Sequence, residues 1–263
     1  MSPLGRVAIP LGLALLYAFV LAPIVLVVLI SFSADNFIRF PPQQWGFRWY
    51  RALLQHATFL TAFRTSLILA ATVTLLDLAV GIPAAYAIAR LRFRGRDALF
   101  ALLTAPLLLP SIVLGLSMLL AFSPLRLVAT YPGLTLAHMT ITLPFVVRII
   151  ATALSTLPPD VEDAAATLGA PPRRVFRRVT LPLMIPGVIA AAALAFILSF
   201  DEVVISLFIV GPRLSTLPVE VFHYVENRTD PMVAALCAAL ILGSLGIVLV
   251  LERTVGFLRA LSR

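Results

Sequence analysis

The chain contains no lysine, only one cysteine and few charged residues, and these absences exclude several kinds of protein. Of its 263 residues 12% are charged, whereas 61% are hydrophobic, which is more apolar material than one soluble core can bury. The single cysteine, Cys237, can form no internal disulfide and cannot by itself build a metal site. The composition therefore indicates an integral membrane protein.

The motifs of several enzyme classes are also missing. The sequence has no Walker-type phosphate loop, no nucleophile elbow and no cluster of His, Cys and carboxylate residues at metal-binding spacing. We therefore expect a chain that is not an enzyme and binds no cofactor or metal itself, so that any work on a solute draws energy from a partner or a gradient. The net charge of +8 rests on arginines dispersed along the chain, which argues against a nucleic-acid partner.

Long apolar runs divide the chain into candidate membrane spans. Runs of about 20 residues fit helices, whereas the strands of a membrane barrel alternate over roughly 10 residues. We predict an all-α bundle that forms one transmembrane domain over residues 1–263. The six expected spans are Val7–Ile30, Ala62–Ala89, Ala98–Phe122, Leu134–Thr156, Leu183–Ile209 and Met232–Leu251.

The arginines predict which side of the membrane each loop occupies. An even number of spans puts both termini on one side, and the segments expected there are rich in arginine. These arginines are Arg6, Arg90, Arg92, Arg94, Arg96, Arg173, Arg174, Arg177, Arg178, Arg253, Arg259 and Arg263. By the positive-inside rule, we expect the termini and the loop at residues 157–182 to be cytoplasmic, in a protein of the bacterial inner membrane.

The polar loop at residues 157–182 contains the signals of a short amphipathic helix. Pro158 and Pro159 stop the preceding span, and Asp160 can cap a new helix. Gly169 can take the left-handed position at its C-terminus. The residues expected on its apolar face are Val161, Ala164, Ala165 and Leu168, and Pro171 and Pro172 prevent its continuation.

The order of residues in this loop is more specific than the helix signals alone. Asp163-Ala164-Ala165 is followed by Gly169 and then by Val179-Thr180-Leu181-Pro182. This resembles the EAA loop of binding-protein-dependent ABC importer permeases, in which Glu-Ala-Ala precedes a glycine and an Ile-x-Leu-Pro sequence at the same spacing. Asp163 replaces the usual glutamate, with Glu162 beside it, so either acid can serve the family's acidic role.

The resemblance implies the permease fold of a type I importer, in which the loop helix sits in a groove of a cytoplasmic ATPase and transmits its closure to the pore. The implied coupling residues are Glu162, Asp163, Ala164, Ala165, Leu168, Gly169, Leu181 and Pro182. It also implies a second permease, expected to be a different chain, two ATPase subunits that use ATP and Mg, and an extracytoplasmic binding protein. We interpret the arginines after the helix as contacts for anionic membrane lipids, with ATPase contact as the alternative.

A second resemblance concerns the substrate. The segments LPFVVR at 143–148, SFDEVVISLFI at 199–209 and TLPVEVF at 216–222 are similar to the permeases of spermidine and putrescine importers. This implies a small cationic solute, a polyamine. The alternatives are an importer of another small solute, such as an opine, an amino-acid derivative, thiamine or an iron complex, or a secondary transporter driven by a gradient.

Carboxylates within the expected spans are candidates for the substrate pathway. Asp201 and Glu202 should lie about 25 Å from the cytoplasmic edge of the fifth span, where a carboxylate suits a cation. Three structural alternatives remain open: a cap at a break in the span, a place at the outer interface, or an ion pair. For Asp77, in the second span, we expect an ion pair with Arg148 first and a place in the pathway second.

Overall fold

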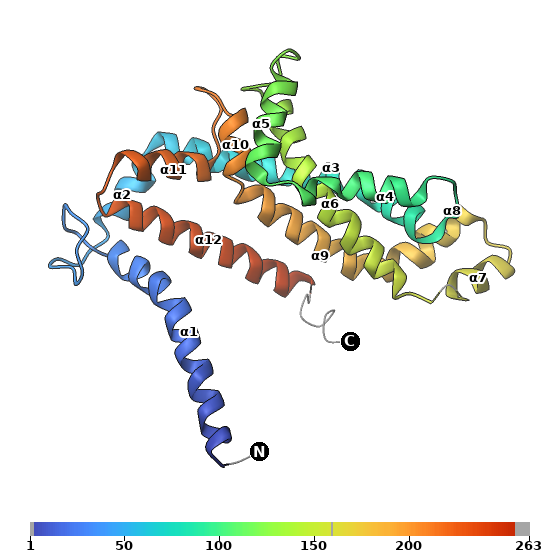
Figure 1. Ribbon diagram of the computed structural model, residues 1–263, viewed down its shortest axis with the longest axis horizontal. Helices are drawn as coiled ribbons and strands as arrows, with labels where there is room; N and C mark the ends of the chain where they lie inside the picture. The colour runs from blue at the N-terminus through green and yellow to red at the C-terminus, as the bar shows by residue number, and fades with distance from the viewer. Residues whose placement is uncertain (1–2, 159, 256–263) are drawn as a thin grey trace. The chain divides into compact units, whose positions relative to one another are not determined.

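The computed structural model describes residues 3–158 and 160–255. Its regular structure over these residues is helical, apart from two isolated β-bridges (Figure 1). In chain order the elements are α1 (Pro3–Ser31), α2 (Arg48–Gln55), α3 (Ala57–Arg90), α4 (Arg96–Thr104), the 3₁₀ turn η1 (Ala105–Leu108), α5 (Ser111–Phe122), α6 (Tyr131–Ser155), α7 (Asp160–Thr167), α8 (Pro172–Val175), the π-helical turn η2 (Phe176–Thr180), α9 (Leu181–Phe200), α10 (Val204–Ile209), α11 (Leu217–Asn227) and α12 (Met232–Val255).

The apolar helices confirm the all-α membrane class predicted from the sequence. Within the described residues, four helical stretches are long and apolar enough to cross a membrane. They are Ile9–Ser31, Ala57–Arg90, Tyr131–Ser155 and Pro172–Phe200. A fifth span results if α4 to α5 is counted as one bent span, and the apolar helix Met232–Gly246 within α12 is shorter.

Two compact units make up the described chain, one of residues 3–60 and 221–245 and one of residues 61–220 and 246–255. In the first unit, α2 is tied to the segment around the end of α1. The Tyr50 hydroxyl lies 2.7 Å from the Ser31 hydroxyl, and the Trp49 indole N–H donates to the Asp35 carbonyl at 3.1 Å. The prediction of a single transmembrane domain stays a prediction.

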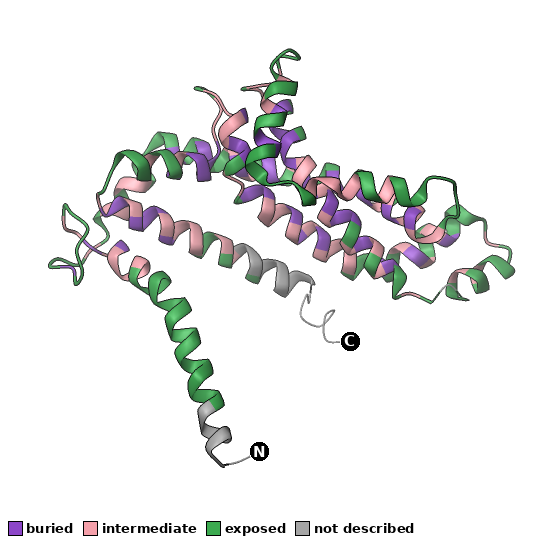
Figure 2. Cartoon of the chain, viewed as in Figure 1, coloured by how far each residue is buried: buried purple, intermediate pink, exposed green. Residues whose placement is uncertain are grey.

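The core of the second unit lies where α6 packs along α9. Val147 and Ile150 of α6 and Met184 and Ala191 of α9 are buried in it, and buried residues recur along both helices (Figure 2). Gly187 of α9 faces Ala153 of α6 so closely that a Cβ on the glycine would have no room. This close approach holds the end of α6, where the polar loop begins, against the start of α9.

The third expected span, Ala98–Phe122, is not one straight helix but is broken near its middle. The stretch Arg96–Leu108 meets α5 at an angle of 108°. Pro110 explains the break, because proline lacks the N–H of a helical hydrogen bond and disfavours helical backbone in the residue before it. Accordingly Leu109, just before Pro110, is extended, with φ −103° and ψ 139°.

The fifth expected span, Leu183–Ile209, is also interrupted, as one of the alternatives left open by the sequence allowed. The helix α9 ends at Phe200 and α10 starts at Val204. The chain between them contains the two acids that the sequence singled out. The break therefore decides how each of those acids points.

Candidate coupling loop and transport pathway

The polar loop folds into the short helix that its sequence predicts. The helix α7 (Asp160–Thr167) carries three acids in its first turn, where the helix dipole favours negative charge. Pro159, expected to stop the preceding span, lies outside the described residues. Asp160 forms the first residue of the helix.

The end of α7 confirms the predicted role of Gly169. Its φ is +81°, in the left-handed region that glycine adopts without strain. The Gly169 N–H donates to the Ala166 carbonyl at 2.9 Å and the Ala170 N–H to the Ala165 carbonyl at 3.2 Å. This pair of bonds is the Schellman motif, which satisfies the last carbonyls and stops the helix.

The two candidate acids of α7 face in different directions. Glu162 is half-buried against the rest of the unit, whereas Asp163 is exposed. The predicted apolar face is largely exposed as well, since Val161 and Ala164 are exposed and Leu168 is 89% exposed, while Ala165 is half-buried. An exposed apolar face beside an exposed acid is a surface that another protein can cover.

The chain after α7 turns back into the membrane helices. Pro171 precedes α8 and Pro172 occupies its first turn, where a proline loses no hydrogen bond. Leu181 and Pro182 then form the first turn of α9, directly after the π-helical turn. The two ends of the predicted coupling motif, Asp163 and Pro182, therefore lie on separate elements of the same loop.

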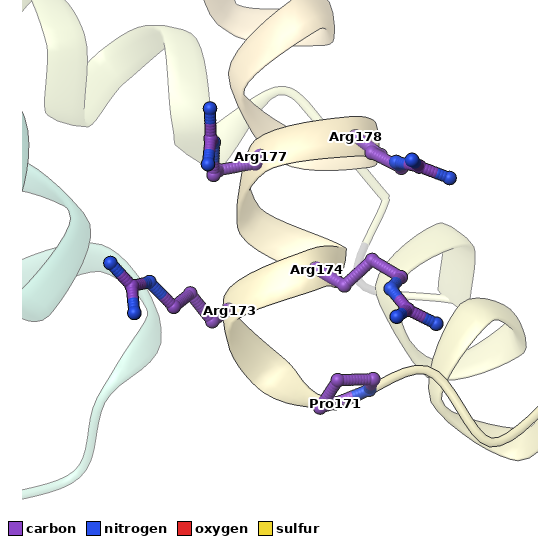
Figure 3. A pocket seen from close by; sticks show the side chains of 5 residues that line it. All are labelled: Pro171, Arg173, Arg174, Arg177 and Arg178. Carbon is purple, nitrogen blue, oxygen red and sulfur yellow. The ribbon is translucent and has the colours of Figure 1, made fainter.

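Four arginines between these two ends form a basic surface. We call them the arginine cluster: Arg173, Arg174, Arg177 and Arg178. All four are exposed, and within the described residues none of them pairs with a carboxylate. With Pro171 they line a hollow of about 650 Å³, with Arg173 and Arg177 extending to one side of the helix and Arg174 and Arg178 to the other (Figure 3). This surface suits anionic groups.

The break between α9 and α10 separates the roles of Asp201 and Glu202. The Glu202 carboxylate accepts a hydrogen bond from the Ile205 N–H at 2.9 Å, and so caps the start of α10. Asp201 is the C-terminal cap residue of α9, through its backbone N–H to the Ile197 carbonyl at 3.0 Å, and its side chain is exposed. Glu202 thus has a structural task, and the free carboxylate of the pair belongs to Asp201.

Asp77 does not form the predicted ion pair with Arg148. Asp77 is 0% exposed, and its Oδ2 accepts a hydrogen bond from the Thr142 hydroxyl, while Arg148 is exposed. Within the described residues its other oxygen, Oδ1, has no hydrogen-bond partner. Asp77 is buried inside the second unit. Its place in the pathway stays a prediction.

A buried histidine links the broken helix to α6. The two ring nitrogens of His138 lie 2.9 Å from the Ser199 hydroxyl of α9 and 2.9 Å from the Ser206 hydroxyl of α10. His138 is fully buried. It holds the two sides of the break in register.

The loop, the break and the arrangement of helices can be compared with known proteins. A family model of binding-protein-dependent transport system inner membrane components matches residues 77–256. The chain belongs to this family. It is the permease of an ABC importer and a multi-pass protein of the inner membrane.

Relatives of this permease carry polyamine names. The putrescine transport system permease protein PotI of Escherichia coli is 37% identical over 94% of this chain and 88% of its own length. The spermidine/putrescine transport system permease protein PotC of Escherichia coli is 33% identical over 89% of this chain and 88% of its own length.

A solved structure shares the fold of this permease. It is a crystal structure of a bacterial alginate ABC transporter in complex with an alginate-pentasaccharide-bound periplasmic protein. The match has a TM-score of 0.72 at 15% identity and covers 94% of this chain and 92% of the other. The importer permease fold expected from the loop is thereby confirmed.

One residue of the permease gained importance only from the structure. The sequence predicts for Arg90 only a place among the arginines of the cytoplasmic side. In the structure its guanidinium contacts Glu162 of α7. The two residues are 72 positions apart, and the sequence contains no signal for their pairing.

Proposed function

We propose that this permease forms half of the translocation pathway of an ATP-driven importer for polyamines such as putrescine and spermidine. The observation that carries the proposal is Asp201, an exposed carboxylate at a break in a membrane helix. A polyamine is a small cation, and a carboxylate supplies it with charge and hydrogen-bond acceptors after it loses its hydration. The polyamine names of two relatives support the same substrate class.

The proposed topology has six spans with both termini in the cytoplasm. The described helices supply four spans, the bent pair α4 to α5 a fifth, and α12 the sixth. The placement of the arginine-rich segments supports this orientation. Arg259 and Arg263, on which the placement of the C-terminus partly depends, lie outside the described residues.

The proposed assembly contains a second permease of different sequence, two ATPase subunits and an extracytoplasmic binding protein. The exposed apolar face of α7 supports an ATPase partner, because a short helix with no buried residue offers its surface to another chain. The partner subunits bind ATP and Mg and hydrolyse ATP. This chain supplies α7, the helix that transmits the movement of the ATPase to the membrane helices.

The arginine cluster is proposed to contact anionic lipid headgroups. It directly precedes α9, the start of a membrane helix on the proposed cytoplasmic side. Each basic residue near an anionic membrane surface contributes about 1 kcal/mol of attraction. Contact with an acidic patch on the ATPase is the other use of this surface.

The experiment is ATP hydrolysis and uptake by the complete complex in proteoliposomes. The permease is purified together with the products of its neighbouring genes, and the binding protein is loaded with putrescine, spermidine, thiamine, an opine or an iron complex. We expect the two polyamines to stimulate hydrolysis and to be taken up, and an ATPase subunit that cannot hydrolyse ATP to abolish both.

Stimulation by one of the other solutes in place of the polyamines would contradict the substrate class. Uptake that persists with the inactive ATPase would contradict the coupling to ATP. Native mass spectrometry of the same complex counts the subunits, and a transport-competent homodimer of this chain would contradict the second, different permease.

A further inference from the structure

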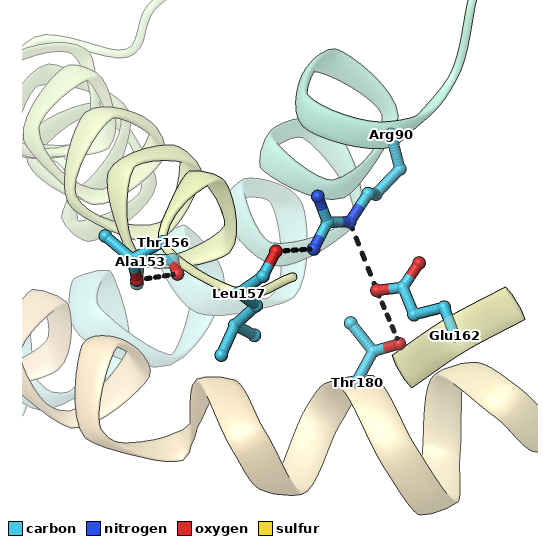
Figure 4. Close-up of polar contacts among 6 residues, drawn as sticks. All are labelled: Arg90, Ala153, Thr156, Leu157, Glu162 and Thr180. Atoms are coloured by element: carbon cyan, nitrogen blue, oxygen red, sulfur yellow. Dashed lines mark hydrogen bonds and ion pairs between the residues drawn. The ribbon is translucent and has the colours of Figure 1, made fainter. Parts of the chain in front are cut away.

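The polar contacts at the base of the coupling loop centre on one ion pair, Arg90 with Glu162. The Arg90 Nε atom lies 3.1 Å from Oε1 of Glu162, and the Thr180 hydroxyl donates to the same oxygen at 3.0 Å. A second Arg90 nitrogen, Nη2, donates to the Leu157 carbonyl at 3.0 Å. Figure 4 shows these residues turned toward one another from four segments of the chain.

These contacts connect the elements whose relative motion the proposed function requires. Arg90 is the last residue of α3, Leu157 follows the end of α6, and Thr180 is the last residue of η2, directly before α9. Glu162 lies on α7, the helix with the exposed apolar face. The Glu162 carboxylate therefore links α7 directly to the ends of α3 and η2, and Arg90 extends the link to the end of α6.

Apolar packing gives α7 little hold on the rest of the chain. It is eight residues long and has no buried residue, and helices of this length are marginal on their own in water. Within the described residues, Arg90–Glu162 is the only ion pair between an arginine and a carboxylate. The Arg90 and Glu162 side chains are 13% and 16% exposed, so solvent screens this pair less than a fully exposed one.

We propose that Arg90, Glu162 and Thr180 form a clamp that transmits movement of the coupling helix to α3 and α9. The proposal rests on the proposed function, in which an ATPase moves α7. With the clamp in place, a push on α7 acts on the cytoplasmic ends of the membrane helices. Without the clamp, α7 moves with the ATPase while α3 and α9 keep their positions. Glu162 and Arg90 are positioning residues in this scheme, and Asp163 is left to face the partner.

The clamp predicts a change in coupling, measured as solute transported per ATP hydrolysed by the complete complex in proteoliposomes. Glu162→Gln and Arg90→Gln should each lower this ratio by about fivefold or more, the lower end of typical coupling between sites. The double variant should be no worse than either single variant, because both remove the same link. Arg92→Gln is the matched control, since Arg92 lies two positions away, is exposed and loses the same charge.

The ratio separates a transmitting clamp from a merely structural contact. A structural role would reduce the amount of complex, and with it transport and hydrolysis in proportion, leaving the ratio unchanged. An unchanged ratio in both single variants would therefore overturn the proposal. A wild-type complex without solute-stimulated hydrolysis would instead overturn the proposed function.

Thr180→Val keeps the test decisive if the charge variants fail to assemble. Valine has nearly the shape of threonine and removes only one hydrogen bond from the Glu162 carboxylate. The ratio should then fall less than in Glu162→Gln but below that of Arg92→Gln. A wild-type ratio in an assembled Thr180→Val complex would also overturn the clamp.

Discussion

Replacing Gly169 by valine should disturb the coupling loop and leave the surrounding fold intact. Gly169 has a φ of +81°, and a Cβ built there meets nothing within 4 Å. The substitution therefore costs conformational energy and causes no collision. For a residue with a side chain in the left-handed region this cost is roughly 1–2 kcal/mol, and β-branched valine should lie at the upper end.

This cost shifts the equilibrium between the loop conformation that fits the groove of the ATPase and conformations that do not by about 5- to 30-fold. In the purified complex, transport and solute-stimulated ATP hydrolysis should fall together, while membrane insertion and melting temperature stay close to wild type. Gly169→Asn is the matched control, because asparagine enters the left-handed region more readily than other residues with a side chain. It should retain most of the activity.

Gly187→Val provides the contrasting case of a packing defect. A side chain at Gly187 collides with Ala153 between α9 and α6, and overpacking of this kind typically costs about 1–3 kcal/mol of stability. This variant should lower yield and melting temperature. An assembled Gly169→Val complex with normal transport, or one as unstable as Gly187→Val, would refute the reasoning.

Three further predictions concern the pathway, the interior and the basic surface. Asp201→Asn should weaken polyamine uptake about 10- to 150-fold, because a hydrogen bond to a charged group is worth about 1.5–3 kcal/mol. Glu202→Gln keeps an oxygen for the cap of α10 and should transport normally. The reverse ranking of the two variants in uptake assays would contradict this assignment. Thr142→Val should destabilise the protein by about 1–3 kcal/mol, because it strands the buried Asp77 carboxyl, and an unchanged denaturation midpoint would show that the bond is dispensable. Replacing the arginine cluster by glutamines should remove about 1 kcal/mol of attraction to anionic lipid per residue. ATP hydrolysis in vesicles should then depend less on the fraction of anionic lipid. An unchanged lipid dependence would indicate that the cluster contacts the ATPase instead.

Local geometry in the coupling loop could be predicted from its sequence, because neighbouring residues determine it. Gly169 ends α7 in the left-handed conformation as expected. The sequence could not tell which of Glu162 and Asp163 faces inward. That choice depends on Arg90, which is distant in the chain but adjacent in space.

The apolar runs predicted which parts of the chain are membrane helices, but hydropathy alone does not mark where those helices break. Hydropathy averages over many residues, so a bend at Pro110 or a gap after Phe200 leaves it almost unchanged. The proposed pair of Asp77 and Arg148 failed for a related reason. The pair was inferred from the similar depth of the two residues along the membrane normal. Depth says nothing about which face of its helix a side chain occupies, and Asp77 faces Thr142.

The π-helical turn at Phe176–Thr180 sets the rotational phase of the segment before α9. A π turn holds about one residue more than an α turn, so it rotates everything on its N-terminal side by about 100°. With this phase Thr180 faces Glu162, while Arg177 and Arg178 stay exposed. Removing one residue from the turn would restore an uninterrupted α-helix and swing α8 with its arginines out of phase with the membrane helix. The length of this turn therefore decides whether Thr180 can reach Glu162 at all.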